Sequence, residues 1–201
     1  MERGAVMARP VDHERRARLL EAAGDYVIEN GLSDLSLRPL ARELGVTTTT
    51  LVHHFGSRDQ LLTAIIGQVR DRMRQAVDLR SARDADPRAL ITRAWKWLSD
   101  PQHAPLYRLL FEIYGNALQQ PATYQPFLAH IVDDWLDILT VAFEADGDDH
   151  ETATAKATLA VAAARGLLLD LLTTGETGRV TAAFDIYMTA LGGNRGAEAN
   201  G

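Results

Sequence analysis

The sequence contains no cysteine, which excludes disulfide bonds and thiol chemistry. It also lacks a surplus of positive charge, because 21 Lys and Arg residues stand against 27 Asp and Glu residues and give a net charge of -6. An acidic chain is repelled by bulk DNA, so indiscriminate nucleic-acid binding is disfavoured. No apolar signal-peptide core stands at the N-terminus, and no apolar run approaches the roughly 20 residues that span a bilayer. We therefore expect a soluble, cytoplasmic protein without a membrane partner.

Strand signals are lacking as well, and 201 residues with 46% apolar content are enough for two small domains. Proline and glycine divide residues 63–192 into helical segments, one of which runs from Pro121 to about Glu144. The sequence thus predicts an all-α protein of about nine helices. Residues 1–13 are expected to form a flexible arm and residues 193–201 a disordered tail.

Residues 36–61 have the spacing of two short helices joined by a glycine turn, with another helix directly after them. Ser36 is a capping residue ahead of an apolar series that repeats at helical intervals, namely Leu37, Leu40, Ala41 and Leu44. Gly45 lets the chain leave helical geometry, and Thr47 can cap the next helix. This layout is typical of a helix-turn-helix DNA-binding motif.

The second of these helices has an inward face at Leu51 and Phe55. Its outward residues are candidates for reading bases, and they are Thr48, Thr49, Val52 and His53. Other interpretations stay open here, because capped helices around a glycine recur in all-helical proteins and consecutive threonines also serve as caps. A metal site is disfavoured, since adjacent histidines on a helix point about 100° apart and no further ligand stands at a suitable spacing.

The flanking sequence favours the DNA-binding interpretation. Residues 14–30 carry an apolar helical stripe that Gly31 ends, so a supporting helix precedes the motif. Ser57 to Gln60 has the Ser-x-x-Gln form of a capping box, which predicts that a further helix begins near Ser57. The free amides at that helix start, together with Arg58, suit a phosphate group.

Residues 14–62 resemble the DNA-binding domain of TetR/AcrR-type transcriptional regulators. The resemblance rests on Leu40-Ala41, Gly45-Val46-Thr47, Leu51, His53-His54-Phe55 and Ser57-Arg58. It implies a three-helix domain with the third helix in the major groove, joined through a long fourth helix to an effector-binding and dimerising domain over residues 63–192. It implies base contacts at Thr48, Thr49 and His53 and phosphate contacts at Thr47, His54 and Arg58. Arg38 and Val52 complete the predicted DNA-binding residues.

Two of these positions depart from the family pattern. Thr48 stands where a basic residue is common, and Val52 stands where a tyrosine that contacts the DNA backbone is common. Their methyl and hydroxyl groups suit thymine methyls and base edges. Residues 1–58 hold eight arginines and eight acidic residues, so the remainder of the chain carries the net charge of -6. A neutral DNA-binding domain on an acidic body favours specific sites over bulk DNA.

The last two predicted helices, at about 150–173 and 179–191, combine small residues with a stripe of large apolar ones. In the family that the chain resembles, these helices form a four-helix dimer interface. The dimerisation residues that this implies are Leu168, Leu172, Phe184, Tyr187 and Met188. An intramolecular core alone is the alternative interpretation.

Aromatic residues gather between residues 95 and 135, on the helices that enclose the effector in that family. With nearby polar residues they are the candidate ligand contacts, which are Trp95, Tyr107, Phe111, Tyr114, Phe127, His130, Trp135 and Arg165. The same aromatic side chains also fit a plain core. The cavity is expected to be mostly apolar and elongated.

The sequence therefore predicts a homodimeric, ligand-responsive repressor that binds a pseudo-palindromic operator in double-stranded DNA and is released by a small, mostly apolar effector. A helical scaffold protein with a degenerate DNA reader is the alternative. An enzyme is disfavoured, because no Ser/His/Asp or metal-ligand set has a recognisable spacing, and no cofactor is expected.

Overall fold

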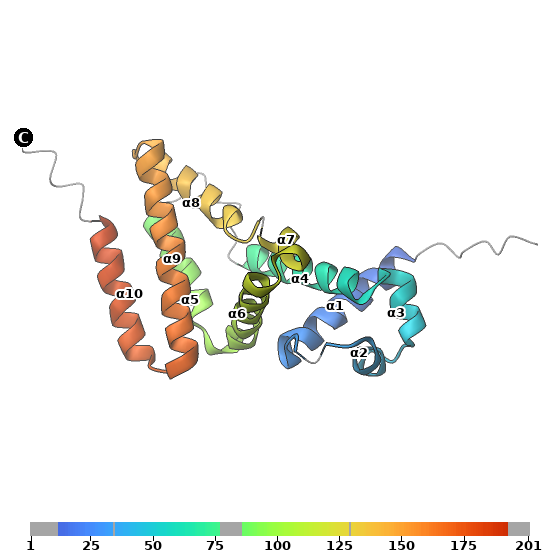
Figure 1. Cartoon of the computed structure of the whole chain (residues 1–201). Coiled ribbons are helices and arrows are strands. Elements are labelled where there is room, and N and C mark those ends of the chain that lie inside the picture. The colour runs from blue at the N-terminus through green and yellow to red at the C-terminus, as the bar shows by residue number, and fades with distance from the viewer. Residues whose placement is uncertain (1–11, 34, 77–85, 129, 193–201) are drawn as a thin grey trace, which may run out of the picture. The chain divides into compact units, whose positions relative to one another are not determined.

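The structure, a computed structural model, describes residues 12–33, 35–76, 86–128 and 130–192. Within these ranges every regular element is a helix (Figure 1). The predicted all-α fold class is confirmed.

Contacts divide the chain into two compact units, Met1–Val69 and Arg70–Gly201, and each is considered by itself. Helix α4, Arg58–Ala76, contributes residues to both. The predicted flexible arm, residues 1–13, lies almost wholly outside the described residues, and the predicted tail, residues 193–201, lies wholly outside them.

The first unit contains three helices ahead of α4, namely α1 (His13–Asn30), α2 (Leu37–Glu43) and α3 (Thr48–Phe55). The side chain of Asp12 caps α1 by accepting from the Arg15 amide at 3.0 Å. The helices pack through side chains at helical spacing that have no exposed surface: Ala23, Val27, Leu40, Leu51 and Ile65. The apolar stripes predicted from the sequence therefore form the core of this unit.

The turn between α2 and α3 follows the predicted chemistry. Gly45 has φ 62°, a left-handed conformation that glycine adopts without a Cβ clash. The Val46 amide then donates to the carbonyl of Ala41 at 2.9 Å, which closes the end of α2. Thr47 caps α3, because its hydroxyl accepts from the Thr50 amide at 3.1 Å.

The second unit comprises the end of α4 and a set of further helices, and the described ones are α5 (Pro87–Leu98), the short 3-10 helix η2 (Pro101–His103), α6 (Ala104–Gln119), α7 (Pro121–Leu128), α8 (Asp133–Ala145), α9 (His150–Thr174) and α10 (Thr177–Gly192). The single helix predicted from Pro121 to about Glu144 is in fact two helices. The Phe127 carbonyl accepts from the amides of both His130 and Ile131, at 3.1 and 3.0 Å. This tightened turn ends α7 and lets α8 start in a new direction.

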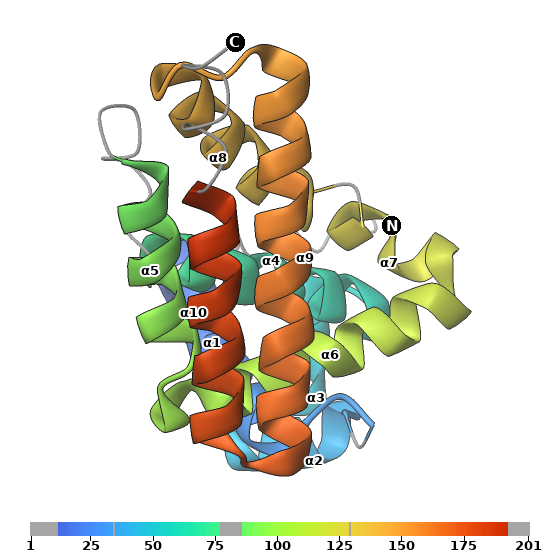
Figure 2. The same ribbon diagram turned by 90° about the vertical axis from the view of Figure 1, so that its left-hand side faces the viewer.

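Helices α9 and α10 lie side by side (Figure 1, Figure 2). Gly175, with φ 71°, ends α9, and Arg179 of α10 reaches back to the Asp170 carboxylate with two hydrogen bonds of 2.6 and 2.7 Å. By length and composition α9 is apolar enough to cross a membrane, yet only 22% of its most apolar window is buried. The apolar surface of α9 thus exceeds what this unit covers.

Asp134 joins the last turns of α4 to the start of α8. Arg70 donates to both of its carboxylate oxygens, at 2.5 and 2.8 Å, and Arg74 approaches to 3.7 Å. The Asp134 side chain is 13% exposed. The Arg70 hydrogen bonds hold the pKa of Asp134 below its ordinary value. A bidentate, partly buried pair of this kind is stronger than a surface ion pair.

We predict that Asp134→Asn lowers the free energy of unfolding by roughly 2 kcal/mol at neutral pH, because it removes the charge from a bidentate pair. The folded pKa of Asp134 lies below the unfolded value of about 3.9, so this stabilisation is present above that value and is lost as pH falls through the folded pKa. Denaturant unfolding at neutral and acidic pH measures the difference. Asp133→Asn, at the exposed neighbouring position, is the control, and an equal loss in both variants contradicts the prediction.

Candidate DNA-binding surface and ligand cavity

Helix α3 exposes the face that the sequence assigns to base reading. Thr49, Val52 and His53 are exposed, with Val52 at 47%, and Thr48 is partly exposed. Leu51 on the opposite face has no exposed surface. An exposed valine between polar residues offers a methyl contact flanked by hydrogen-bonding groups. Arg38, on α2, is exposed as well.

Thr47 also serves the helix itself. Its hydroxyl lies 2.9 Å from the Thr50 hydroxyl, in addition to capping the Thr50 amide. This capping role is the one that the alternative interpretation assigned to the threonine run. Thr47 remains exposed, so one hydroxyl can cap α3 and still face solvent.

His54, which the sequence predicts at a phosphate-contacting position, has its side chain packed inside the first unit. The residue is 9% exposed, and its ring meets His53 at 5.2 Å in an edge-on contact. Its carbonyl accepts from Nε of Arg16 at 3.2 Å, and the Arg16 guanidinium lies 5.0 Å from the Phe55 ring. Burial lowers the pKa of His54, and the positive charges of His53 and Arg15 lower it further. His54 is therefore buried in its neutral form.

Arg58 stands at the first turn of α4, where the capping box is confirmed. The Ser57 amide donates to the Gln60 side chain at 2.8 Å, and the Gln60 amide donates to the Ser57 hydroxyl at 3.2 Å. Nε of Arg58 donates to the Leu35 carbonyl at 2.9 Å, while its side chain stays 49% exposed. The guanidinium is thus held in place at a helix N-terminus with its outer edge accessible.

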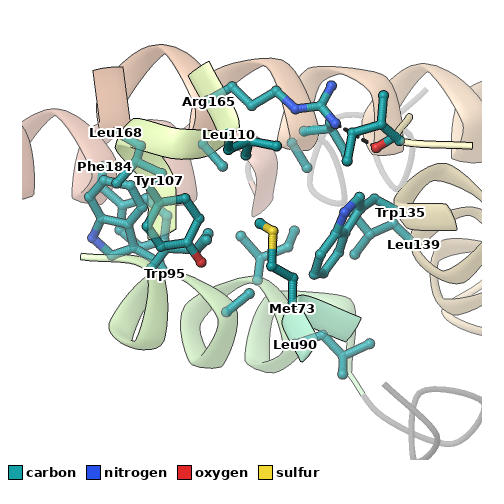
Figure 3. A pocket seen from close by; sticks show the side chains of 17 residues that line it. Met73, Leu90, Trp95, Tyr107, Leu110, Trp135, Leu139, Arg165, Leu168 and Phe184 are labelled. Carbon is teal, nitrogen blue, oxygen red and sulfur yellow. Dashed lines mark hydrogen bonds between the residues drawn. The ribbon is translucent and has the colours of Figure 1, made fainter. Parts of the chain in front are cut away.

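A cavity of about 80 Å³ lies within the second unit (Figure 3). Four of the eight predicted ligand contacts line it, namely Trp95, Tyr107, Trp135 and Arg165. The other four are absent from its lining: Phe111, Tyr114, Phe127 and His130. Tyr114 and Phe127 pack on each other at 5.3 Å, and His130 is exposed. The cavity is mostly apolar, as the sequence suggested.

Several lining residues escaped the sequence interpretation. Met73 comes from α4 and Leu139 from α8, whereas Ala94, Ala160 and Ala164 provide space without side-chain bulk. The only local signal for them is the apolar spacing of each helix, which marks an inward face and cannot separate a cavity wall from a filled core.

Two of the residues that line this apolar cavity carry polar groups, Arg165 and Tyr107. Nη2 of Arg165 donates to the Ile131 carbonyl at 2.8 Å, and its guanidinium lies 5.3 Å from the Tyr114 ring (Figure 3). Burial lowers the pKa of Arg165. The Tyr107 hydroxyl is buried without a hydrogen-bond partner among the described residues, and this burial raises its pKa. Both groups have unused hydrogen-bonding capacity.

Three of the five residues predicted for dimer contacts pack inside the unit. Leu168, Phe184 and Met188 are buried, and Phe184 stacks on Trp95 at 4.7 Å. The largest apolar side chains have been used for the chain's own core. The exposed apolar residues of α9 and α10 are instead Ala155, Leu159, Ala162, Gly166, Leu169, Ala182, Ile186 and Ala190. Leu172 and Tyr187 are partly buried.

Comparisons with known proteins concern the helix-turn-helix region and the fold. A family model described as bacterial regulatory proteins, tetR family, matches residues 19–65. The HTH-type transcriptional regulator PksA of Bacillus subtilis is 30% identical over 83 residues, which cover 41% of this chain and 40% of PksA. The curated relatives PksA and BetI of Paraburkholderia phytofirmans are thus matched over 40% and 56% of their own length.

Solved structures extend the likeness along the chain. The multidrug binding protein EbrR, complexed with imidazole, is 28% identical with a TM-score of 0.67, and the match covers 95% of this chain and 96% of EbrR. A transcriptional regulator from Rhodococcus sp. Rha1 has a TM-score of 0.74 at 21% identity, over 88% of this chain and 95% of that one. The latter similarity concerns the fold alone.

Packing of neutral His54 makes the first unit sensitive to acid. Its folded pKa lies below the unfolded value of about 6.5, so stability is full above that value and decreases as pH falls below it. We predict that His54→Leu loses less stability than the natural protein between about pH 7 and pH 5. Thermal unfolding measures this, with His53→Leu at the exposed neighbour as control. A pH profile of His54→Leu that matches the natural protein contradicts the prediction.

Proposed function

Because the chain belongs to the TetR family of DNA-binding transcriptional regulators, which are not enzymes, we propose that it is a homodimeric repressor released from a pseudo-palindromic operator by a small, mostly apolar effector. We place it in the cytoplasm, with its operator. One observation carries the proposal. Helix α4 begins at Arg58, beside the candidate phosphate site, and continues without interruption to Met73, which lines the cavity.

The DNA-binding part of the proposal rests on what α3 exposes. No lysine or arginine lies between Thr47 and Phe55, so α3 offers hydroxyl, methyl and imidazole groups to base edges. Phosphate contacts then fall to residues outside α3, chiefly Arg58 and Arg38, and to helix N-termini. Weak general attraction with specific contacts on one helix face suits recognition of particular sites rather than bulk DNA.

The dimer part rests on the uncovered apolar stripe of α9 and α10. Leu159 is 54% exposed, Leu169 45% and Ile186 72%, and they are interspersed with alanines and Gly166. Small residues let helices approach closely, and a contiguous apolar stripe calls for a cover. In a symmetric dimer the stripe of one copy packs against the same stripe of the other. The two-fold symmetry then presents two α3 helices to two half-sites. This cover also accounts for the membrane-like composition of α9.

Release is proposed to act through α4. The cavity of about 80 Å³ is smaller than the roughly 150 Å³ that an engineered cavity needs to hold benzene. An effector must therefore move its walls, and Met73 is a flexible wall residue on α4. Displacement of Met73 would tilt a helix that runs roughly 22 Å back to Arg58. Two half-sites lie about 34 Å apart, so a tilt in both protomers changes the spacing of the two α3 helices and they no longer fit the operator.

The structures of EbrR complexed with imidazole and with proflavin support a small-molecule effector.

Substitutions on the DNA-binding surface should distinguish residues that contact bases from residues that contact phosphates. We predict that Thr49→Ala and His53→Ala change the bases preferred at particular operator positions, each mismatch shifting affinity by about 1–3 kcal/mol. Arg58→Ala should weaken all sequences alike and flatten the salt dependence by about one phosphate contact. Selection from random DNA, followed by salt titration of the enriched sequence, measures both. If all three variants lower the affinity for every DNA sequence by the same factor, the assignment is refuted. If the selection enriches no palindrome, the scaffold alternative is favoured.

The dimer stripe can be tested with charges. Leu159→Glu and Ile186→Glu each place a carboxylate in the proposed interface, where desolvation is costly. We expect each to convert the dimer to monomer in sedimentation velocity and to lower operator affinity by about tenfold or more. Leu118→Glu, at a 76% exposed leucine on α6, is the matched control and should change neither. A dimer that survives both stripe substitutions would place the interface elsewhere.

A further inference from the structure

We propose that the effector carries an anionic oxygen group, such as a carboxylate, on an apolar body, and that the Arg165 guanidinium binds this group. The inference rests on the proposed function, because it names the chemical class of the effector that would release the operator. It starts from an imbalance of charge in the cavity. Of the 17 lining residues, Arg165 is the sole one with a charged side chain, and none is Asp or Glu.

The guanidinium of Arg165 is incompletely satisfied by the described residues. Its contacts there are one hydrogen bond to the Ile131 carbonyl at 2.8 Å and the Tyr114 ring at 5.3 Å. A guanidinium has five N–H donors, and neither of these partners neutralises its charge. A partly buried arginine without a carboxylate is costly, and Arg70 of the same unit shows how such a charge is neutralised. Its side chain is 23% exposed, and it pairs with Asp134.

The remaining walls are apolar, and once they move apart as proposed above they would enclose an apolar body of some length. Trp95 and Phe184 stack at one end of the cavity and Trp135 stands at the other, with Met73 between them (Figure 3). The Tyr107 hydroxyl, buried without a partner among the described residues, adds a second donor in an otherwise apolar lining. A chain or small ring between the tryptophans, with a carboxylate toward Arg165, uses both the walls and the unused donors.

The sign of the charge follows from what the lining contains. A cationic ligand would meet a like charge at Arg165 without any lining carboxylate to offset it. A neutral alcohol would fill the apolar space but leave the guanidinium charge uncompensated. An anion both replaces the missing counter-ion and accepts a fork of hydrogen bonds. The cavity therefore selects an apolar anion over a neutral or cationic molecule of equal size.

The test compares three probes that share one eight-carbon chain: octanoate, 1-octanol and octylammonium. Tryptophan fluorescence of the full-length protein reports binding, since Trp95 and Trp135 line the cavity. We expect octanoate to bind at least about tenfold more tightly than 1-octanol, and octylammonium to bind most weakly. Octylammonium binding as tightly as octanoate would overturn the inference.

Variants locate the effect. Arg165→Met should bring octanoate and 1-octanol to within about threefold of each other, while the affinity for 1-octanol stays close to that of the natural protein. Arg108→Met, which removes an exposed arginine of α6 outside the cavity, should leave the preference intact. Ala164→Phe, which fills the cavity, should weaken all three probes. An unchanged octanoate preference in Arg165→Met, or unchanged octanoate affinity in Ala164→Phe, contradicts the proposal. If Arg165→Met does not fold, the three probes on the natural protein still decide the sign of the charge.

Operator binding is measured separately, so that the two proposals fail differently. Release of the selected operator by 1-octanol or octylammonium, but not by octanoate, would overturn the anionic effector and leave the repressor intact. Preferred binding of octanoate that leaves a bound operator in place would support the anion site and count against ligand-induced release.

Discussion

One helix, α4, contributes buried residues to both units, and the proposed regulation depends on that constraint. Ile65 and Val69 are buried in the first unit, with 0% and 2% exposure. A turn further on, Arg70 is bound to Asp134 and Met73 lines the cavity of the second unit. A regular helix transmits a displacement along its axis, because its backbone hydrogen bonds resist bending. In the proposed release, a displacement of Met73 reaches the start of the same helix.

The charged residues of the two units also differ in their surroundings. Positive side chains near α3 are fixed by local contacts, as Arg16 is by the His54 carbonyl and Arg58 by the Leu35 carbonyl. Arg70, which the second unit buries in part, is neutralised by Asp134, whereas Arg165 has a carbonyl and an aromatic ring as its partners among the described residues. The proposed weak general affinity for DNA and the proposed anion site at Arg165 both follow from this distribution of charge.

The sequence predicted those features that depend on short-range signals. The Ser57–Gln60 capping box, the Gly45 turn and the helix ending at Gly31 each require only a few adjacent residues, and all are present. Features set by packing between distant helices were harder to predict. Apolar spacing identified α9 and α10, while the dimer contact of their large residues was implied by the family resemblance, and Phe184 of that set packs on Trp95 within the unit. Four of the eight predicted ligand contacts do not line the cavity, because clustering of aromatic residues along the sequence does not say which helix an inward face meets.

The central claim, that a ligand in the cavity moves the DNA-binding units through α4, can be measured as a distance. The chain has no cysteine, so Glu43→Cys on the exposed surface of α2 carries a single spin label per protomer. Pulsed electron spin resonance on the dimer then gives the separation of the two labels with and without the tightest-binding octyl probe. The account predicts a shift of several ångströms on ligand binding, and loss of that shift in Ala164→Phe. A label separation that stays the same at saturating ligand, while the operator is nevertheless released, would contradict it.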